Sequence, residues 1–198
     1  CAKGHVDPAR LVLDQGAAVD RADKDGWTPL FIACENGHVA VATLVLDKGA
    51  AVDRADKDGW TPLFVACEKG RVALATLLLD KGAAVDRPNK NGATSLYVAC
   101  QNGHVDAARL LLDNGAAVDR AKEDGATPLY IACQDGHVAL ARLLLDKGAA
   151  VDRATKNGTT PLYVACHQGH DAVATLLLDK GAAVDRAEKN GATPLYIA

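Results

Sequence analysis

Residues 91–120 decide the fold, and their sequence is NGATSLYVACQNGHVDAARLLLDNGAAVDR. Asn91 and Gly92 both tolerate positive φ, so this pair predicts the tip of a two-residue hairpin. Thr94 follows shortly after the turn. Its side-chain oxygen can accept a hydrogen bond from a free amide of a first helical turn, which makes it a predicted helix N-cap.

Two short helices are predicted next in the same stretch. Leu96, Ala99 and Cys100 recur at helical spacing, so we expect a first helix that ends near Gly103. His104 leads into a second helix that is apolar on almost all sides. Its apolar residues are Ala107, Ala108, Leu110, Leu111 and Leu112. Neither helix is long enough to be stable alone in water, so each must pack against neighbours.

An extended arm closes the stretch. Gly115 suits the left-handed conformation that ends many helices. Residues 116–120 then lead, as an extended segment, to the next turn at Asp124 and Gly125. The predicted unit is therefore helix, turn, helix and extended hairpin.

The same unit repeats along the chain with a period of 33 residues. The cysteines mark this period: Cys1, Cys34, Cys67, Cys100, Cys133 and Cys166. A Thr-x-Leu unit recurs with the same step, and its middle residue is Pro in every copy except Ser95. Pro is favoured at the first helical position because its missing N–H has no partner there. Such a period predicts a solenoid whose stacked units share one continuous core.

The repeated pattern resembles a known family. It is Gly-x-Thr-Pro-Leu-aromatic-x-Ala-Cys-x-x-Gly-His, then Leu-Leu-Leu-Asp-x-Gly-Ala-x-Val-Asp, and it resembles the ankyrin repeat over the whole chain. The resemblance implies an all-α solenoid of helix–turn–helix units joined by extended, β-hairpin-like loops. Cys stands where the family often has a second Ala. The family's His after Thr-Pro-Leu is replaced by Phe31, Phe64, Tyr97, Tyr130, Tyr163 and Tyr196. This second departure removes the side chain that makes the family's hydrogen bonds across the first helical turn.

We expect one domain over residues 1–198. Its approximate units are 24–56, 57–89, 90–122, 123–155 and 156–188, with partial units at 1–23 and 189–198. Repeat arrays usually need polar capping units for solubility, and none is evident. The chain also contains no Met, even at position 1. We therefore expect an uncapped fragment of a larger array, able to associate head to tail through its ends.

Bulk composition excludes several classes of protein. The formal net charge is −3 with the two signs well mixed, which argues against nucleic acid as the main partner. No window approaches the 18 consecutive apolar residues of a transmembrane helix, so we expect no membrane insertion. Residues 1–5 lack the apolar core of a signal peptide, so we expect a cytoplasmic protein.

Cysteine and histidine chemistry is expected to be structural. Equivalent cysteines of stacked helices lie about 8–10 Å apart, whereas a disulfide needs Cα atoms within about 7 Å. We expect free, buried thiols in a reducing compartment, with Cys1 exposed. Cys166, His167 and His170 are the only local cluster with zinc-ligand residue types. Because Cys166 belongs to the core column and His170 to the helix–helix turn, we expect no metal site.

No catalytic arrangement is evident. The chain lacks a nucleophile with a base and an orienting group, and no Gly-rich phosphate loop follows a strand. A solenoid also presents the same residue at regular steps, whereas an active site needs unlike residues at one place. We expect no catalytic residues, no cofactor and no enzymatic activity.

The columns that vary between units predict the partner-binding surface, around the hairpin tip and the end of the first helix. The resemblance places these columns on the concave side. Trp27 and Trp60 follow the turn glycine in two units, where the other units have small residues. The same two units have Glu35 and Glu68, and exposed Trp is enriched at binding hot spots, so we expect a partner with basic character. The predicted partner-binding residues are Trp27, Trp60, Phe31, Phe64, Glu35, Glu68, Asn36, Lys69, Gln101, Gln134 and His167. The alternative is that each Trp packs locally over its own hairpin and the neighbouring Phe.

The predicted function is a protein–protein interaction scaffold. Two alternatives stay open: a structural spacer, and a regulatory ankyrin segment of a larger enzyme or channel. A second candidate surface is the repeated Asp-Arg of the arms with the lysines of the tips, which could bind acidic groups or be a solvated face. Those lysines are Lys24, Lys57, Lys90, Lys156 and Lys189.

Overall fold

The computed structural model describes all 198 residues and contains twelve α-helices and no strand. The helices are α1 (Val6–Asp14), α2 (Pro29–Asn36), α3 (Val39–Asp47), α4 (Pro62–Glu68), α5 (Val72–Asp80), α6 (Ser95–Gln101), α7 (Val105–Asp113), α8 (Pro128–Gln134), α9 (Val138–Asp146), α10 (Pro161–His167), α11 (Asp171–Asp179) and α12 (Pro194–Ile197). The predicted all-α solenoid is confirmed. None of these helices combines the length and the apolar character that crossing a membrane requires.

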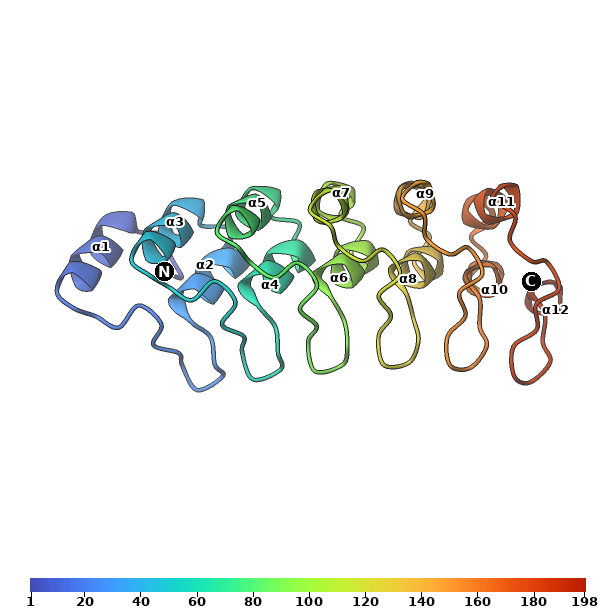
Figure 1. The fold of residues 1–198 in the computed structure, drawn as a ribbon, viewed down its shortest axis with the longest axis horizontal. Helices are drawn as coiled ribbons and strands as arrows, with labels where there is room; N and C mark the ends of the chain where they lie inside the picture. Colours follow the sequence, from blue (N-terminus) through green and yellow to red (C-terminus); the bar gives the residue numbers. More distant parts are fainter.

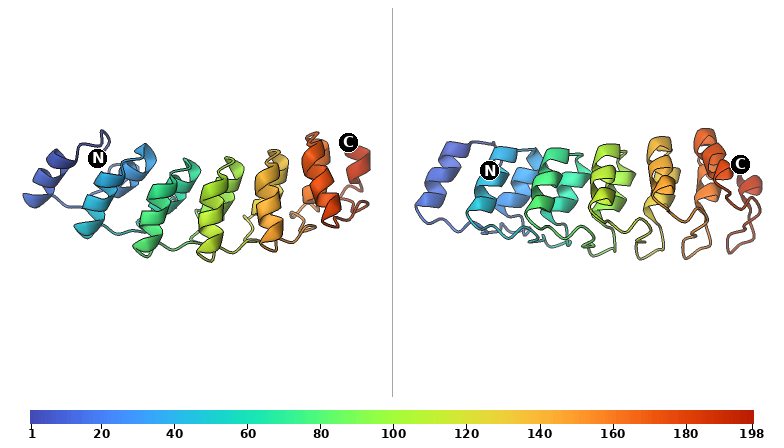
Figure 2. Two further views of the ribbon diagram at one scale, coloured as in Figure 1. Left: turned by 90° about the horizontal axis from the view of Figure 1, so that it is seen from above. Right: turned by 45° about the horizontal axis from the view of Figure 1, so that its top comes forward.

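The helices form two parallel rows. The first helices of the units, α2 to α12 with even numbers, lie in one row, and the second helices, α1 to α11 with odd numbers, lie in the other (Figure 1). The loops between units project on one side, next to the row of first helices (Figure 1). Seen from above, the whole array follows a gentle curve (Figure 2).

Each first helix begins at the predicted threonine cap. The hydroxyl oxygen accepts a hydrogen bond from the amide three residues later, at N–O distances of 3.1–3.3 Å in all six copies. The capping residues are Thr28, Thr61, Thr94, Thr127, Thr160 and Thr193. Such a cap satisfies one of the amides that a helix leaves free at its start.

The core lies between the two rows of helices. The leucine two residues after each threonine is 0–2% exposed in five copies, Leu30, Leu63, Leu96, Leu129 and Leu162. The small side chains of the Ala-Cys pair let neighbouring first helices pack closely. All six cysteines are free, and the four from Cys34 to Cys133 are buried. Burial raises the pKa of the Cys34 thiol to about 12, so this thiol stays protonated and unreactive at neutral pH.

Several kinds of hydrogen bond join neighbouring units, and three that recur along the array have constant sequence separations. Both carboxylate oxygens of Asp53 accept from the amide of Ala84, 31 residues on, at 3.2 and 3.1 Å. Lys81 Nζ lies 2.9 Å from an Asp47 oxygen, 34 residues earlier. The ring Nε2 of a histidine, such as His104, donates to a carbonyl 36 residues earlier at 2.9 Å. The aspartates of the Asp-Arg pairs therefore hold units together.

The hairpin tip differs from the predicted two-residue turn, and that prediction is wrong. Gly92 has a φ of +79°, but no other type of residue has positive φ, so Asn91 does not. The amide of Asn89 donates to Ala93 O at 2.9 Å, and that of Gly92 donates to Asn89 O at 3.0 Å. This is a three-residue loop with glycine last. The Asn91 carbonyl then accepts from Glu123 N of the next hairpin at 3.3 Å, so this turn lets successive tips bond to one another.

Candidate partner-binding surface

An open hollow of about 500 Å³ lies between the hairpins that precede α2 and α4. We call it the tryptophan hollow. It brings together six of the predicted residues: Trp27, Phe31, Glu35, Trp60, Glu68 and Lys69. It also contains Lys57, one of the tip lysines of the second candidate surface, and four residues that the sequence pattern did not single out: Asp25, Asp56, Asp58 and Val65.

Each tryptophan packs against the phenylalanine of its own unit, stacked in the first pair and tilted in the second. The ring centroids of Trp27 and Phe31 are 5.6 Å apart with planes 17° from parallel, and those of Trp60 and Phe64 are 5.2 Å apart at 32°. Phe31 and Phe64 are only 2% and 3% exposed, whereas both indoles are half-buried. The local packing expected as the alternative is therefore present, and it leaves part of each indole open to solvent.

A carboxylate in the turn fixes the backbone that leads to each tryptophan. Asp23 Oδ1 accepts from the amides of Asp25 and Trp27, both at 2.9 Å. The hydrogen bond from the Trp27 amide lowers the pKa of Asp23 below its usual value, so this group stays ionised at neutral pH. Asp56 Oδ1 makes the same two bonds, the one from Trp60 N being 2.8 Å long.

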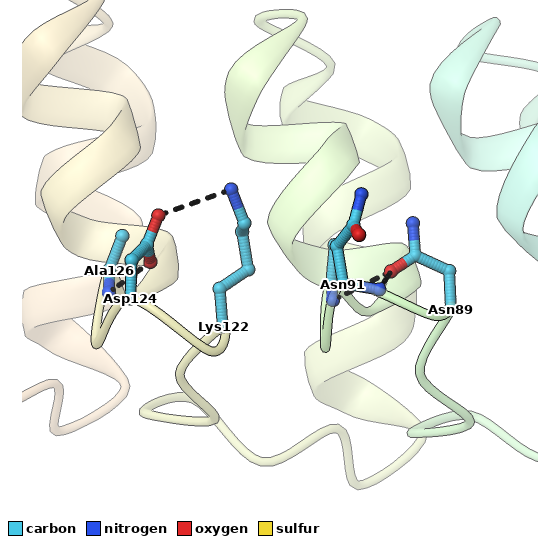
Figure 3. Close-up of polar contacts among 6 residues, drawn as sticks. Asn89, Asn91, Lys122, Asp124 and Ala126 are labelled. Carbon is cyan, nitrogen blue, oxygen red and sulfur yellow. Dashed lines mark hydrogen bonds and ion pairs between the residues drawn. The ribbon is translucent and has the colours of Figure 1, made fainter.

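Later hairpins vary at this position. Asn89 Oδ1 still accepts from two amides at 3.0 Å, but Lys122 has no acceptor to offer (Figure 3). In that hairpin Asp124 accepts from Ala126 N at 2.9 Å instead. Lys122 Nζ lies 3.3 Å from an Asp124 oxygen and 5.3 Å from the centroid of the Tyr97 ring. The side chain at this position is therefore a hydrogen-bond acceptor in the third hairpin and a cation in the fourth.

Negative charge dominates the tryptophan hollow. Its acidic side chains are Asp25, Glu35, Asp56, Asp58 and Glu68, against the two cations Lys57 and Lys69. Lys69 Nζ already lies 3.2 Å from a Glu68 oxygen. Because the remaining carboxylates stand next to partly exposed indoles, the hollow is suited to a cationic group.

The other predicted residues lie elsewhere. Phe64 lies beneath Trp60, while Asn36, Gln101, Gln134 and His167 lie at the ends of α2, α6, α8 and α10, outside the hollow. Asn36 Nδ2 donates to Ile32 O at 2.9 Å. Gln101 and His167 are exposed, and Gln134 is half-buried.

The cysteine–histidine cluster does not converge on one point. Cys166 is half-buried and His167 is exposed. The ring Nε2 of His170 donates to Gln134 O at 3.0 Å, in the inter-unit ladder. No group of three or more His, Cys, Asp or Glu side chains is arranged to hold a metal ion.

Comparison with family models identifies the class of protein. The model described as "Ankyrin repeats (3 copies)" matches residues 1–89, 49–122, 83–155, 117–188 and 150–198, which together cover the chain. The chain therefore belongs to the ankyrin repeat family. Members of this family are generally protein–protein interaction modules.

Solved structures agree with this class. The human ASB11 ankyrin repeat domain is 33% identical with a TM-score of 0.92, over 100% of this chain and 88% of that one. The ankyrin repeat domain of Bcl-3, described as a unique member of the IkappaB protein family, is 27% identical with a TM-score of 0.87, over 100% of this chain and 90% of that one. No curated protein matches the chain significantly.

Proposed function

We propose that the tryptophan hollow binds a positively charged segment of a partner protein. The observation behind this proposal is that two half-exposed indoles and five carboxylates line the same hollow. The family to which the chain belongs generally binds proteins, which supports a protein as the partner.

The chemistry of the hollow favours Arg or Lys. A cation over an indole face is attracted by about 0.5–2 kcal/mol, and more so where water is excluded. Carboxylates around the rings would form charge-assisted hydrogen bonds with the same cation. Glu35 and Glu68 are half-buried at the first-helix ends, within the same hollow as the indoles.

Preorganisation adds to this chemistry. Each indole already packs against a buried Phe, and its backbone is tied to a turn carboxylate. Ordering a side chain on binding costs about 0.5–1.5 kcal/mol, so an indole that is ordered beforehand avoids that cost.

Intrinsic fluorescence tests the proposal directly, because Trp27 and Trp60 are the only tryptophans in the chain. The probe is an alternating Arg-Lys octapeptide, which contributes no tryptophan signal. We expect a saturable change in emission. The double variant Glu35→Gln, Glu68→Gln should weaken binding about tenfold, because it removes two carboxylates from the hollow. Glutamine is the natural residue at the same position of two later units, Gln101 and Gln134.

The matched control is Asp80→Asn with Asp179→Asn. Both aspartates are exposed, neither is in an ion pair, and the pair changes the net charge equally. We expect this control to bind the peptide as the natural chain does. Equal losses in the two double variants would mean nonspecific charge attraction and would contradict the proposal.

We further propose that the chain acts by binding and not by catalysis. Cys34, Cys67, Cys100 and Cys133 are buried, and burial raises the pKa of each thiol, so none offers a reactive thiolate. A spacer role predicts no saturable ligand for the tryptophan hollow, so the fluorescence titration also separates these alternatives. A regulatory segment would bind in the same way and would differ only in what adjoins it.

A second candidate is association through the end surfaces. Leu195 and Tyr196 are 83% and 80% exposed at one end of the array, and Leu11 and Val12 are also exposed at the other. Stacking these faces would bury apolar area in the same way as neighbouring units do. Light scattering against concentration tests this idea: mass should rise with concentration, and Leu195→Gln with Tyr196→Gln should abolish the rise. A constant monomeric mass would contradict it.

An intracellular, reducing location is the remaining proposal. All six cysteines are free, and Cys1 is exposed. In an oxidising compartment Cys1 would pair with other thiols. Mass-tag labelling of the protein from acid-quenched cells should count six reduced thiols, and a Cys1-linked dimer would contradict this location.

A further inference from the structure

A groove of opposite charge lies between the last two hairpins. It has a volume of about 820 Å³ and separates the arms of loop 147–160 from loop 180–193. Four cations line it, Arg153, Lys156, Arg186 and Lys189, and we call it the cationic groove. We propose that this groove binds a short acidic peptide segment of a partner chain, independently of the tryptophan hollow.

The four cations lack carboxylate partners within the chain. Every ion pair in the structure joins other residues. The one carboxylate in the groove, Asp152, has both oxygens engaged by the amide of Ala183, at 3.0 and 3.2 Å. Arg186 donates through one nitrogen to Asp152 O at 2.8 Å, which holds its side chain in place and leaves its other donors available.

Two further acidic residues precede cations of the groove in the chain, Asp185 before Arg186 and Glu188 before Lys189. Neither lines the groove. Glu188 Oε1 instead accepts a hydrogen bond from Asn190 Nδ2 of the same tip, at 3.4 Å. Arg153, Lys156 and Lys189 are exposed and accessible to a ligand.

The chain contains a reference groove of the same size. It lies between loop 48–61 and loop 81–94, also with a volume of about 820 Å³. It has three cations, Arg54, Arg87 and Lys90, and two carboxylates, Asp53 and Asp56. Thr155 replaces Asp56 in the cationic groove, so similar backbone geometry is combined there with more positive charge.

The charge distribution favours a short peptide over a long polyanion. The whole chain has a net charge of −3, and the tryptophan hollow is acidic, so an extended nucleic acid would meet repulsion beyond the groove. Two of the four cations are arginines, whose planar guanidinium matches a carboxylate in bidentate geometry. An Asp- or Glu-rich segment lying along the arms would satisfy them.

Fluorescence anisotropy with a labelled alternating Asp-Glu octapeptide tests the proposal. Lys189→Glu should weaken binding about fivefold or more, and Lys90→Glu, the same change in the reference groove, less than about twofold. The variant Trp27→Ala, Trp60→Ala should leave this affinity unchanged, so failure here and failure of the tryptophan hollow are distinguishable. Equal effects of Lys189→Glu and Lys90→Glu would overturn the assignment.

Thr155→Asp separates binding from folding. The introduced carboxylate restores the turn acceptor of Asp56, so the variant should be at least as stable as the natural chain. It should nevertheless weaken binding of the acidic peptide about threefold, because it adds a negative charge to the groove. Unchanged affinity would overturn the proposal. If a short DNA duplex bound more tightly than the peptide, and Lys189→Glu abolished that binding, the ligand of the groove would be nucleic acid and not a peptide.

Discussion

The hairpins of the two halves of the array have the same backbone but different tips. In the first three, the side chain that begins the turn is Asp23, Asp56 or Asn89, and each accepts two backbone hydrogen bonds. In the last three it is a lysine, a threonine or a glutamate, and none of these makes both bonds. The backbone pairing does not follow this change. Asp56 N to Trp60 O and Thr155 N to Thr159 O are both 3.0 Å.

The difference indicates which part of the hairpin the fold requires. Bonds between successive tips also match, since Lys90 N to Asp58 O and Lys189 N to Asn157 O are both 3.0 Å. Glycine geometry and backbone pairing therefore maintain the array, while the first turn side chain can vary. That freedom lets one half present an acidic, aromatic hollow and the other a cationic groove.

The largest effect is expected from Gly125→Ala, which breaks the backbone pairing shared by both halves. Gly125 has a φ of +88°, and an added Cβ would lie 2.8 Å from Lys156 N of the next hairpin. We expect a loss of about 3 kcal/mol in the free energy of unfolding, from backbone strain plus the clash. Gly115→Ala is the control: its φ is +85° but its surroundings are open, so about 1–2 kcal/mol is expected. Urea unfolding followed by circular dichroism measures both, and equal losses would refute the role of the close approach.

Trp60→Ala tests how much the indole contributes to stability, because it removes a kind of side chain that only the first half has. Loss of the packing against Phe64 and of buried indole area should cost about 1–2 kcal/mol. Thr159→Ala at the same position of a later unit should cost only a few tenths. The same urea titration tests this pair. If the two losses were equal, the indole would contribute nothing to local packing.

Asp56→Thr should convert a first-half tip into a second-half tip at a cost of about 1 kcal/mol. Two amide hydrogen bonds, from Asp58 and Trp60, lose their acceptor. Asp56→Asn is the matched control, because Asn89 makes the same bonds naturally, and it should cost less than about 0.5 kcal/mol. Thermal unfolding of the natural chain and the two variants tests this order of stability. A control as unstable as Asp56→Thr would mean that charge, not hydrogen bonding, matters.

The smallest effect concerns pH. The pKa of Asp23 is lowered from 3.8, chiefly by the hydrogen bond from Trp27 N. A carboxyl group with a lowered pKa stabilises the folded state above its unfolded pKa, and this contribution is lost as pH falls below 3.8 through the folded pKa. Asp23→Asn keeps an acceptor but cannot titrate, so its unfolding midpoint should fall less than that of the natural chain between about pH 5 and pH 2. Parallel pH profiles would contradict this linkage.

Much of the fold could be predicted from the sequence because its signals share one period. Caps such as Thr94, core leucines such as Leu96 and the cysteine column all indicate the same helix boundaries. The turn at Asn91 and Gly92 could not be predicted in detail. The residue types alone do not distinguish the two- and three-residue forms of such a loop.

The candidate sites were predictable only in part. The variable columns indicated Trp27, Trp60 and their glutamates, which the hollow does bring together. The sequence does not mark Asp25 and Asp58 as site residues, because Asp before Gly is typical of any turn. The sequence does contain a signal for these tip residues, because the residue types at the hairpin tips vary from unit to unit among Asp, Asn and others. Which face of a hairpin each charge occupies depends on the path of the arms, which no residue type specifies.

The constant separations of 31, 34 and 36 residues in the bonds between units have a consequence for how the array can change length. Adding or deleting a whole 33-residue unit leaves every donor facing an equivalent acceptor. An insertion of any other length inside a helix would shift the residues after it out of register with both neighbouring units. Length variants that keep every bond in register along the helices should therefore differ by whole units, wherever along the chain the exchange takes place.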